Sequence, residues 1–281
     1  MTVARPLTPD LVVADAVASL EDLHSLTSSL DPEDWTRATD CPGWDVHDVV
    51  AHVVGFEAML DGSPTPGQVL DETHVHNEIG AINQAWIESL RDVEPAALLD
   101  DLRALADRRR QELAARPPED FEALTWSPVG EVPLARFLQI RTFDVWFHEQ
   151  DVREATSRPG GLDGPVAERA LTELTSALGY VVGKRGEVPD GDSVRFVLAS
   201  DPSSSDGRPE IVIDVAVRGR ARVVDDLEGD PTAVVETDLA TFTRLAGGRR
   251  DPQELLDSGR VRISGDAELG DRVVRNLAYV I

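Results

Sequence analysis

Cysteine and lysine are almost absent, because Cys41 and Lys184 are the single examples of their kinds among 281 residues. One cysteine excludes a disulfide within the chain and any metal site built from several thiolates. A bound metal would therefore need histidine and carboxylate ligands. No apolar run approaches the ~18 residues that cross a bilayer, and the first residues lack the pattern of a secretory signal. We expect a cytoplasmic protein that does not bind membranes.

Basic residues are also scarce, with 27 of them against 52 acidic residues and a formal net charge of -25. Such a surface repels phosphate backbones and anionic lipid, which argues against nucleic-acid partners and against docking on a membrane. The preference for arginine over lysine, in a chain rich in Ala, Val, Gly and Asp, is typical of a GC-rich genome. The acidity itself is explained by solubility or by the bias of the source organism.

The pattern of residues divides the chain in two. The Gly/Pro-rich stretch 157–165 predicts a boundary between a domain at 1–157 and a domain at 165–281. The first domain has apolar residues at helical spacing and predicts a four-helix bundle. Its helices are expected at 9–30, 45–60 with Asp45 as N-cap, 70–92 with a continuation at 95–115, and 133–155.

The second domain alternates helical and strand patterns and predicts an α+β fold. Helices are expected at 165–183, 239–246, 252–257 and 267–279. Strands are expected at 193–199, 210–217, 221–224, 232–236 and 261–264. The class of the whole chain is therefore α+β.

The helix at 133–155 carries an unusual polar stripe. On a helical wheel, Arg141, His148 and Asp151 all lie within about 60° of Asp144, beside core-type residues. Buried charge is costly unless it is paired or bound to metal. Asp144 and His148 are one helical turn apart, so one ion could reach both, and a facing helix offers His52 as a third ligand. An ordinary surface pair explains the spacing of Asp144 and His148 equally well.

Other polar features have simpler interpretations. His24, His47, His74 and His76 are interpreted as hydrogen-bonded or surface residues, although His74 and His76 could chelate an ion in an extended segment. Cys41 precedes a helix, where a thiol pKa can fall, but a packed structural thiol is the favoured interpretation. The arginines at 108–110 are interpreted as a solvated helix face.

Three arginines, Arg218, Arg220 and Arg222, alternate along one expected strand and would share a face. An exposed charged face is the simplest interpretation. The alternative is that one of them pairs with an anionic substrate, and we take Arg222 and Arg220 as catalytic candidates on that basis.

Two segments together resemble a known family. Cys41-Pro-Gly-Trp-Asp-Val-His-Asp-Val-Val-Ala-His52, with Arg141-x-x-Asp144-x-x-x-His148-x-x-Asp151, resembles the mycothiol-dependent maleylpyruvate isomerases, which are DinB-like metal-binding four-helix bundles. The resemblance covers about residues 8–157. The second domain resembles, more diffusely, the family's C-terminal domain, which is similar to sterol carrier protein 2.

The resemblance implies a divalent metal, usually zinc, held by His52, Asp144 and His148, and the low-molecular-weight thiol mycothiol of actinobacteria as cofactor. Arg141 and Asp151 are the candidate cofactor-binding residues. The family's middle ligand is expected to be glutamate, so Asp144 departs from the pattern by one methylene. The implied activity is a thiol-dependent isomerisation or S-transfer on a small, electrophilic, anionic substrate. A non-enzymatic carrier of lipid or another small molecule, and hydrolysis by metal-activated water, remain alternatives.

Overall fold

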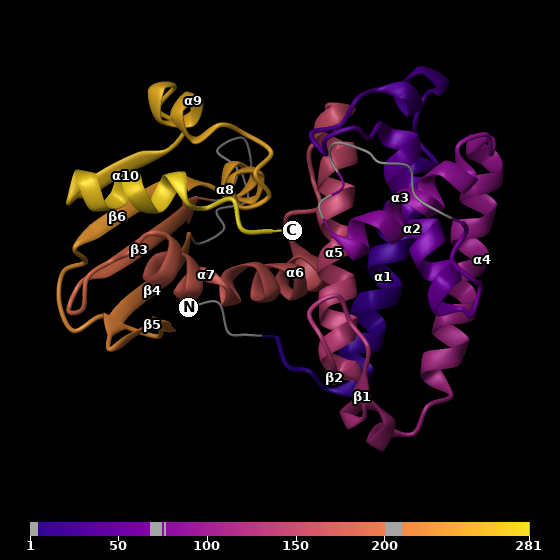
Figure 1. Ribbon diagram of the computed structural model, residues 1–281, viewed down its shortest axis with the longest axis horizontal. Coiled ribbons are helices and arrows are strands. Elements are labelled where there is room, and N and C mark those ends of the chain that lie inside the picture. Colours follow the sequence, from indigo (N-terminus) through magenta and orange to yellow (C-terminus); the bar gives the residue numbers. More distant parts are fainter. Residues whose placement is uncertain (1–4, 68–74, 76, 200–209, 281) are drawn as a thin grey trace. The chain divides into compact units, whose positions relative to one another are not determined.

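The computed structural model describes residues 5–67, 75, 77–199 and 210–280 (Figure 1). It divides into two compact units, Arg5–Ala170 and the chain from Leu171 onward. The first unit is helical and the second combines helices with a sheet, so the expected α+β class is confirmed. No helix among the described residues is long and apolar enough to cross a membrane.

The first unit is a four-helix bundle with a fifth helix attached, counted over the residues that the structure describes. The bundle consists of α1 (Pro9–Thr27), α2 (Val46–Leu60), α4 (Pro95–Ala114) and α5 (Leu134–Ala155), while α3 (Glu78–Leu90) packs on α2. The expected continuation of the third helical region is a separate helix, because Pro95 occupies the first turn of α4 and starts it anew. His74 and His76 lie outside the described residues.

Local sequence explains where the second bundle helix begins. The Asp45 side chain accepts a hydrogen bond from the amide of Asp48, and the Asp48 side chain accepts one from the amide of Asp45, as expected for a capping box. Behind this cap, α2 is apolar on most sides and lies at the centre of the core, with Val49, Val50 and Val53 fully buried. Two short 3-10 helices, Pro32–Thr36 and Pro118–Glu122, and a hairpin of β1 (Leu124–Thr125) and β2 (Val132–Pro133) connect the bundle helices.

The expected boundary at 157–165 differs from the observed division, which falls inside α6 (Gly164–Ser176). The Gly/Pro stretch is attached to the bundle, because the Trp146 indole donates a 2.6 Å hydrogen bond to the Gly161 carbonyl. The first turns of α6 are attached as well. The fully buried Arg169 pairs with Asp15 at 2.8 Å and donates to Gln139. These contacts bring residues up to Ala170 into the helical unit.

The second unit contains a five-stranded sheet of order β5-β4-β3-β6-β7, in which only the β3–β6 pair is parallel. The helices α7, α8 and α10 pack on it. The strands are β3 (Ser193–Ala199), β4 (Ile211–Arg218), β5 (Arg220–Val224), β6 (Ala233–Asp238) and β7 (Arg262–Gly265). The helices are α7 (Leu178–Tyr180), followed by a π-helical turn at Val181–Arg185, α8 (Leu239–Ala246), α9 (Pro252–Asp257) and α10 (Ala267–Arg275).

The last helix, α10, ends at Arg275, whereas the expected helix extended to residue 279. The amides of Tyr279 and Val280 donate to the Ala246 carbonyl at the end of α8, and the Tyr279 hydroxyl donates to the Leu174 carbonyl. The chain after Asn276 is therefore held by α8 and α6 rather than by a further helical turn.

Gly55 allows α2 and α3 to approach closely, since a Cβ atom there would lie 2.5 Å from Cβ of Trp86. We expect Gly55→Ala to lower the free energy of unfolding by about 1–3 kcal/mol through overpacking. Gly80→Ala in α3 is the matched control, because its Cβ would meet no atom closer than 3.6 Å. Chemical denaturation of both variants tests this, and equal effects would contradict it.

Candidate metal centre

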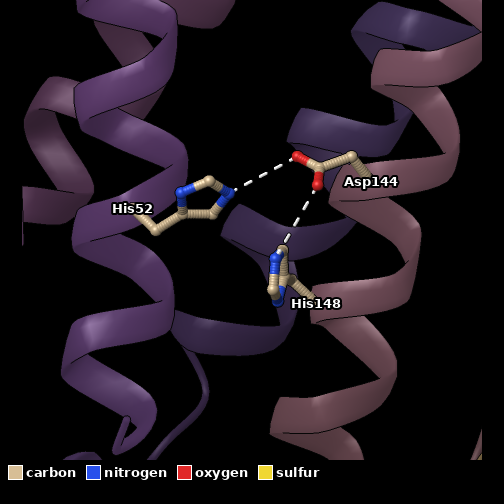
Figure 2. A group of neighbouring side chains, drawn as sticks. All are labelled: His52, Asp144 and His148. Carbon is tan, nitrogen blue, oxygen red and sulfur yellow. Dashed lines mark hydrogen bonds and ion pairs between the residues drawn. The ribbon is translucent and has the colours of Figure 1, made fainter. Parts of the chain in front are cut away.

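His52 on α2 and the pair Asp144 and His148 on α5 point toward one another across the bundle (Figure 2). Nε2 of His52 lies 3.4 Å from Oδ2 of Asp144, and Nε2 of His148 lies 3.8 Å from Oδ1 of the same carboxylate. One ligand atom from each residue falls within 4.8 Å of the others. Two imidazole nitrogens and a carboxylate oxygen at this separation form a donor set that a single divalent cation can engage.

Both imidazoles are buried, and they differ in the hydrogen bonding of their Nδ1 atoms. Nδ1 of His148 lies 3.2 Å from Oδ2 of Asp151, so Nε2 is the ring nitrogen that faces Asp144. Nδ1 of His52 is buried and has no hydrogen-bond partner among the residues that the structure describes. Burial lowers the pKa of His52 to about 4, against the opposing effect of Asp144. His52 is therefore neutral at pH 7, as a metal ligand must be.

Asp144 is ionised. Burial alone would raise the pKa of its carboxyl, but the Arg141 guanidinium and the two histidines hold that pKa well below its usual range. Nη1 of Arg141 donates to Oδ2 of Asp144. The Asp144 side chain keeps 33% of its surface exposed, so the cluster is accessible from this side.

A turn before α2 places an aromatic ring against both imidazoles. Cys41, Pro42, Gly43 and Trp44 form this turn, closed by a 3.1 Å hydrogen bond from the Trp44 amide to the Cys41 carbonyl. Gly43 has φ 82°, a conformation that favours glycine after proline in a type II turn. The Trp44 ring centroid lies 5.2 Å from that of His52 and 5.6 Å from that of His148. The indole therefore covers one side of the cluster.

The two candidate cofactor-binding residues lie behind the ligands. Asp151 has no exposed surface and contacts His148, while Arg141 is 5% exposed and divides its hydrogen bonds between Asp144 and Glu57. A direct contact of either residue with a thiol cofactor stays a prediction.

Sequence reasoning overlooked two residues of this region, Glu57 and Arg109. Nε of Arg109 donates to Glu57 at 3.0 Å, and the Arg109 side chain is 12% exposed. The interpretation of 108–110 as a solvated face is therefore wrong for its middle residue. Arg108 and Arg110 are half-exposed and pair with Asp61 and Glu21. Glu57 is an acidic residue within an apolar run of α2, and this pattern indicates that it has a buried partner.

A second group of potential ligands at Asp45, His47 and Asp48 has another explanation. Asp45 and Asp48 cap α2, and Nε2 of His47 donates to the Val93 carbonyl at 2.8 Å. These groups are occupied in holding the helix start. Cys41 is partly buried in the turn before α2, and its role stays a prediction.

Arg218, Arg220 and Arg222 belong to the second unit and lie on two strands rather than on one. Arg218 ends β4 and Arg220 begins β5, with Gly219 at φ 65° between them. Arg218 and Arg220 are direct cross-strand partners, so the three side chains share a face because of the hairpin. Arg218 pairs with Glu228 at 2.9 Å, whereas Arg220 and Arg222 are exposed on the edge strand.

Comparison with known proteins agrees with the division into a helical unit and a unit that contains a sheet. The chain matches the mycothiol maleylpyruvate isomerase N-terminal domain over residues 16–153 and the SCP-2 sterol transfer family over residues 190–277. The chain thus combines a helical N-terminal domain with an SCP-2-like C-terminal domain. Residues 16–153 belong to the mycothiol maleylpyruvate isomerase N-terminal domain family.

Solved structures and curated relatives extend the comparison. The crystal structure of a mycothiol-dependent maleylpyruvate isomerase is 19% identical with a TM-score of 0.58, and that of its H52A mutant is 18% identical with a TM-score of 0.56. Each alignment covers 94% of this chain and 95% of the other. Two uncharacterized proteins of Mycobacterium tuberculosis are 29% identical over 145 residues. That match covers 50% of this chain and 65% of theirs, which is less than two thirds.

The low pKa of His52 predicts how the metal-free protein responds to pH. In the unfolded chain His52 titrates at 6.5, and in the folded chain at about 4. Between these values the unfolded state binds more protons, so stability falls as the pH is lowered from about 6.5 to 4, by about 3 kcal/mol for this group.

Denaturant unfolding with a chelator present, at a series of pH values, measures this loss. His52→Gln should remove that part of the pH dependence. An identical slope in the variant and the parent would show that His52 does not cause it.

Proposed function

We propose that the chain is a metal-dependent and mycothiol-dependent enzyme that acts on a small, electrophilic, anionic substrate, as an isomerase or an S-transferase. The observation that carries this proposal is the convergence of His52, Asp144 and His148 in a buried cluster that is open at Asp144. The family match supports the thiol and the general kind of reaction.

The three side chains suit a metal by their own chemistry. Nε2 of each histidine faces Asp144, His52 is neutral, and Asp144 is ionised. Two nitrogens and one oxygen favour zinc among the common divalent cations, and three protein ligands leave a position for an exogenous group. A divalent cation held by these three residues would lower the pKa of a bound thiol and so favour the reactive thiolate at neutral pH.

The residues around the ligands keep them in place. Asp151 forms a hydrogen bond with Nδ1 of His148 and so fixes which ring nitrogen faces the metal cluster. Arg141 fixes the orientation of the Asp144 carboxylate, and Trp44 excludes water from one side of the imidazoles. We therefore assign Arg141 and Asp151 to positioning the ligands rather than to direct contact with the thiol.

A thiol bound at this site would supply a nucleophilic sulfur that can add reversibly to an electrophilic double bond. Its release after rotation about the resulting single bond would give the other geometric isomer with no net change in atoms, whereas protonation of the neighbouring carbon would leave the S-conjugate as the product of an S-transferase. Such an enzyme needs a reduced thiol, so we expect it in the cytoplasm.

Replacing the ligands provides the first test. His52→Ala and His148→Ala should each abolish the roughly one-to-one zinc content of the purified protein and its thiol-dependent activity, because two ligands hold zinc poorly. His24→Ala on α1 is the control and should retain both. Elemental analysis and a screen of electrophiles with and without thiol measure the outcome.

The same assays separate the alternatives. Metal-free protein that carries bound lipid would favour a carrier, and turnover without added thiol would favour hydrolysis. Full metal content after replacement of all three ligands would exclude this site.

The exposed arginines of β5 are the candidates for recognition of an anionic substrate. Within the described part of the chain, Arg220 and Arg222 form no side-chain ion pair, whereas Arg218 on the same face is paired with Glu228. We expect Arg222→Gln or Arg220→Gln to raise KM for the anionic substrate about tenfold or more, through loss of a charge-assisted hydrogen bond. Arg218→Gln should change KM little. Equal effects of all three substitutions in steady-state kinetics would argue for a general surface potential instead.

A further inference from the structure

A row of alternating charges connects α4 to the metal cluster through the core of the bundle. Arg109 on α4 contacts Glu57 on α2, Glu57 contacts Arg141 on α5, and Arg141 contacts Asp144. Glu57 and Arg141 are each 5% exposed. Because an unpaired charge at such depth is costly, every member depends on its neighbours.

Glu57 holds a specific edge of the Arg141 guanidinium. Oε1 of Glu57 accepts from Nη2 at 2.9 Å and from Nε at 3.2 Å, while Oε2 accepts from Arg109. The third nitrogen, Nη1, is left for Asp144. The guanidinium carbon also lies 4.2 Å from the centroid of the Phe56 ring. These contacts therefore determine both the plane of the Arg141 guanidinium and the nitrogen, Nη1, that remains for Asp144.

Packing alone does not hold Arg141. A cavity of about 130 Å³ adjoins Glu57, Arg109 and Arg141, and its walls include Leu20 and Leu138. Since the side chain of Arg141 borders a cavity rather than close-packed neighbours on every side, the hydrogen bonds to Glu57 contribute to its orientation.

The orientation matters because Arg141 and His52 approach the same oxygen of Asp144, Oδ2, whereas His148 faces Oδ1. With Glu57 in place, Arg141 directs a single nitrogen at one oxygen of the carboxylate. Without the Glu57 charge, Asp144 becomes the remaining anionic partner among the groups that Arg141 contacts. The guanidinium then competes more strongly with a cation for this carboxylate, and the site also loses one negative charge.

We propose that Glu57 is a positioning residue of the metal site, which tunes the metal affinity by holding Arg141 to a single hydrogen bond with one oxygen of Asp144. This inference rests on the proposed metal at His52, Asp144 and His148. In the described part of the chain, Glu57 forms no hydrogen bond or ion pair with His52, Asp144 or His148, so it acts through Arg141, and Arg109 is its second partner.

Titration of the full-length protein with Zn²⁺ against a chromogenic chelator tests the inference. We expect Glu57→Gln to weaken Zn²⁺ binding about tenfold to hundredfold, the usual effect of removing a group that orients a metal ligand. Glu112→Gln is the matched control, because Glu112 pairs with the other side of Arg109 but not with Arg141. This exposed charge should matter less than about threefold, since solvent and salt screen it.

A second readout distinguishes positioning from a loss of folding. The absorption bands of the Co²⁺-loaded protein should change in Glu57→Gln and remain unchanged in Glu112→Gln, because they report the geometry of the ligands. In an Arg141→Met background, Glu57→Gln should have no further effect on Zn²⁺ affinity. If Glu57→Gln does not fold, Glu57→Asp provides the test. This variant keeps the negative charge, but its shorter side chain moves the carboxylate away from Arg141 and should weaken Zn²⁺ binding measurably.

Several results would overturn the inference. Unchanged Zn²⁺ affinity in Glu57→Gln or in Glu57→Asp would do so, as would equal losses in Glu57→Gln and Glu112→Gln. Failure of the parent protein to bind Zn²⁺ would instead overturn the proposed function.

Discussion

Compensation of the Asp144 charge is the constraint on which the candidate site depends. A carboxylate between two buried imidazoles stays ionised only if a cation neutralises it, and Arg141 provides that cation from one turn earlier on the same helix. Arg141 needs its own compensation, which comes from Glu57 on the facing helix, and Glu57 is shared in turn with Arg109. These four residues therefore form one connected set of charges, and the metal cluster is its solvent-accessible end.

The substitution of aspartate for the expected glutamate at position 144 is compatible with this arrangement. The shorter side chain still reaches both imidazoles, since its carboxylate oxygens lie 3.4 Å from Nε2 of His52 and 3.8 Å from Nε2 of His148. The Trp44 ring also packs near both histidines. The loss of one methylene therefore does not by itself separate the carboxylate from the histidines.

Much of the fold could be predicted from periodicity and capping signals. The start of α2 at its capping box and the prolines at the starts of α1 and α4 are encoded within a few residues. Long-range contacts caused the differences. The domain division moved into α6 because Arg169 pairs with Asp15, far away in sequence, and α10 ends early because the following residues bond to α8. The face shared by three arginines was expected, but a hairpin at Gly219 produces it rather than one strand.

For the site, the sequence alone determined the inventory: two histidines and an acid at helical positions that permit convergence, and a Pro-Gly turn ahead of one helix. Only the tertiary structure decided which charges compensate one another. A helical wheel places Arg141 and Asp151 on the ligand face. It does not reveal that Asp151 forms a hydrogen bond with His148 or that Arg141 forms one with Glu57. Pairing of buried charges between helices depends on the depth and rotation of each helix in the bundle, and these are set by packing of the whole core rather than by local sequence.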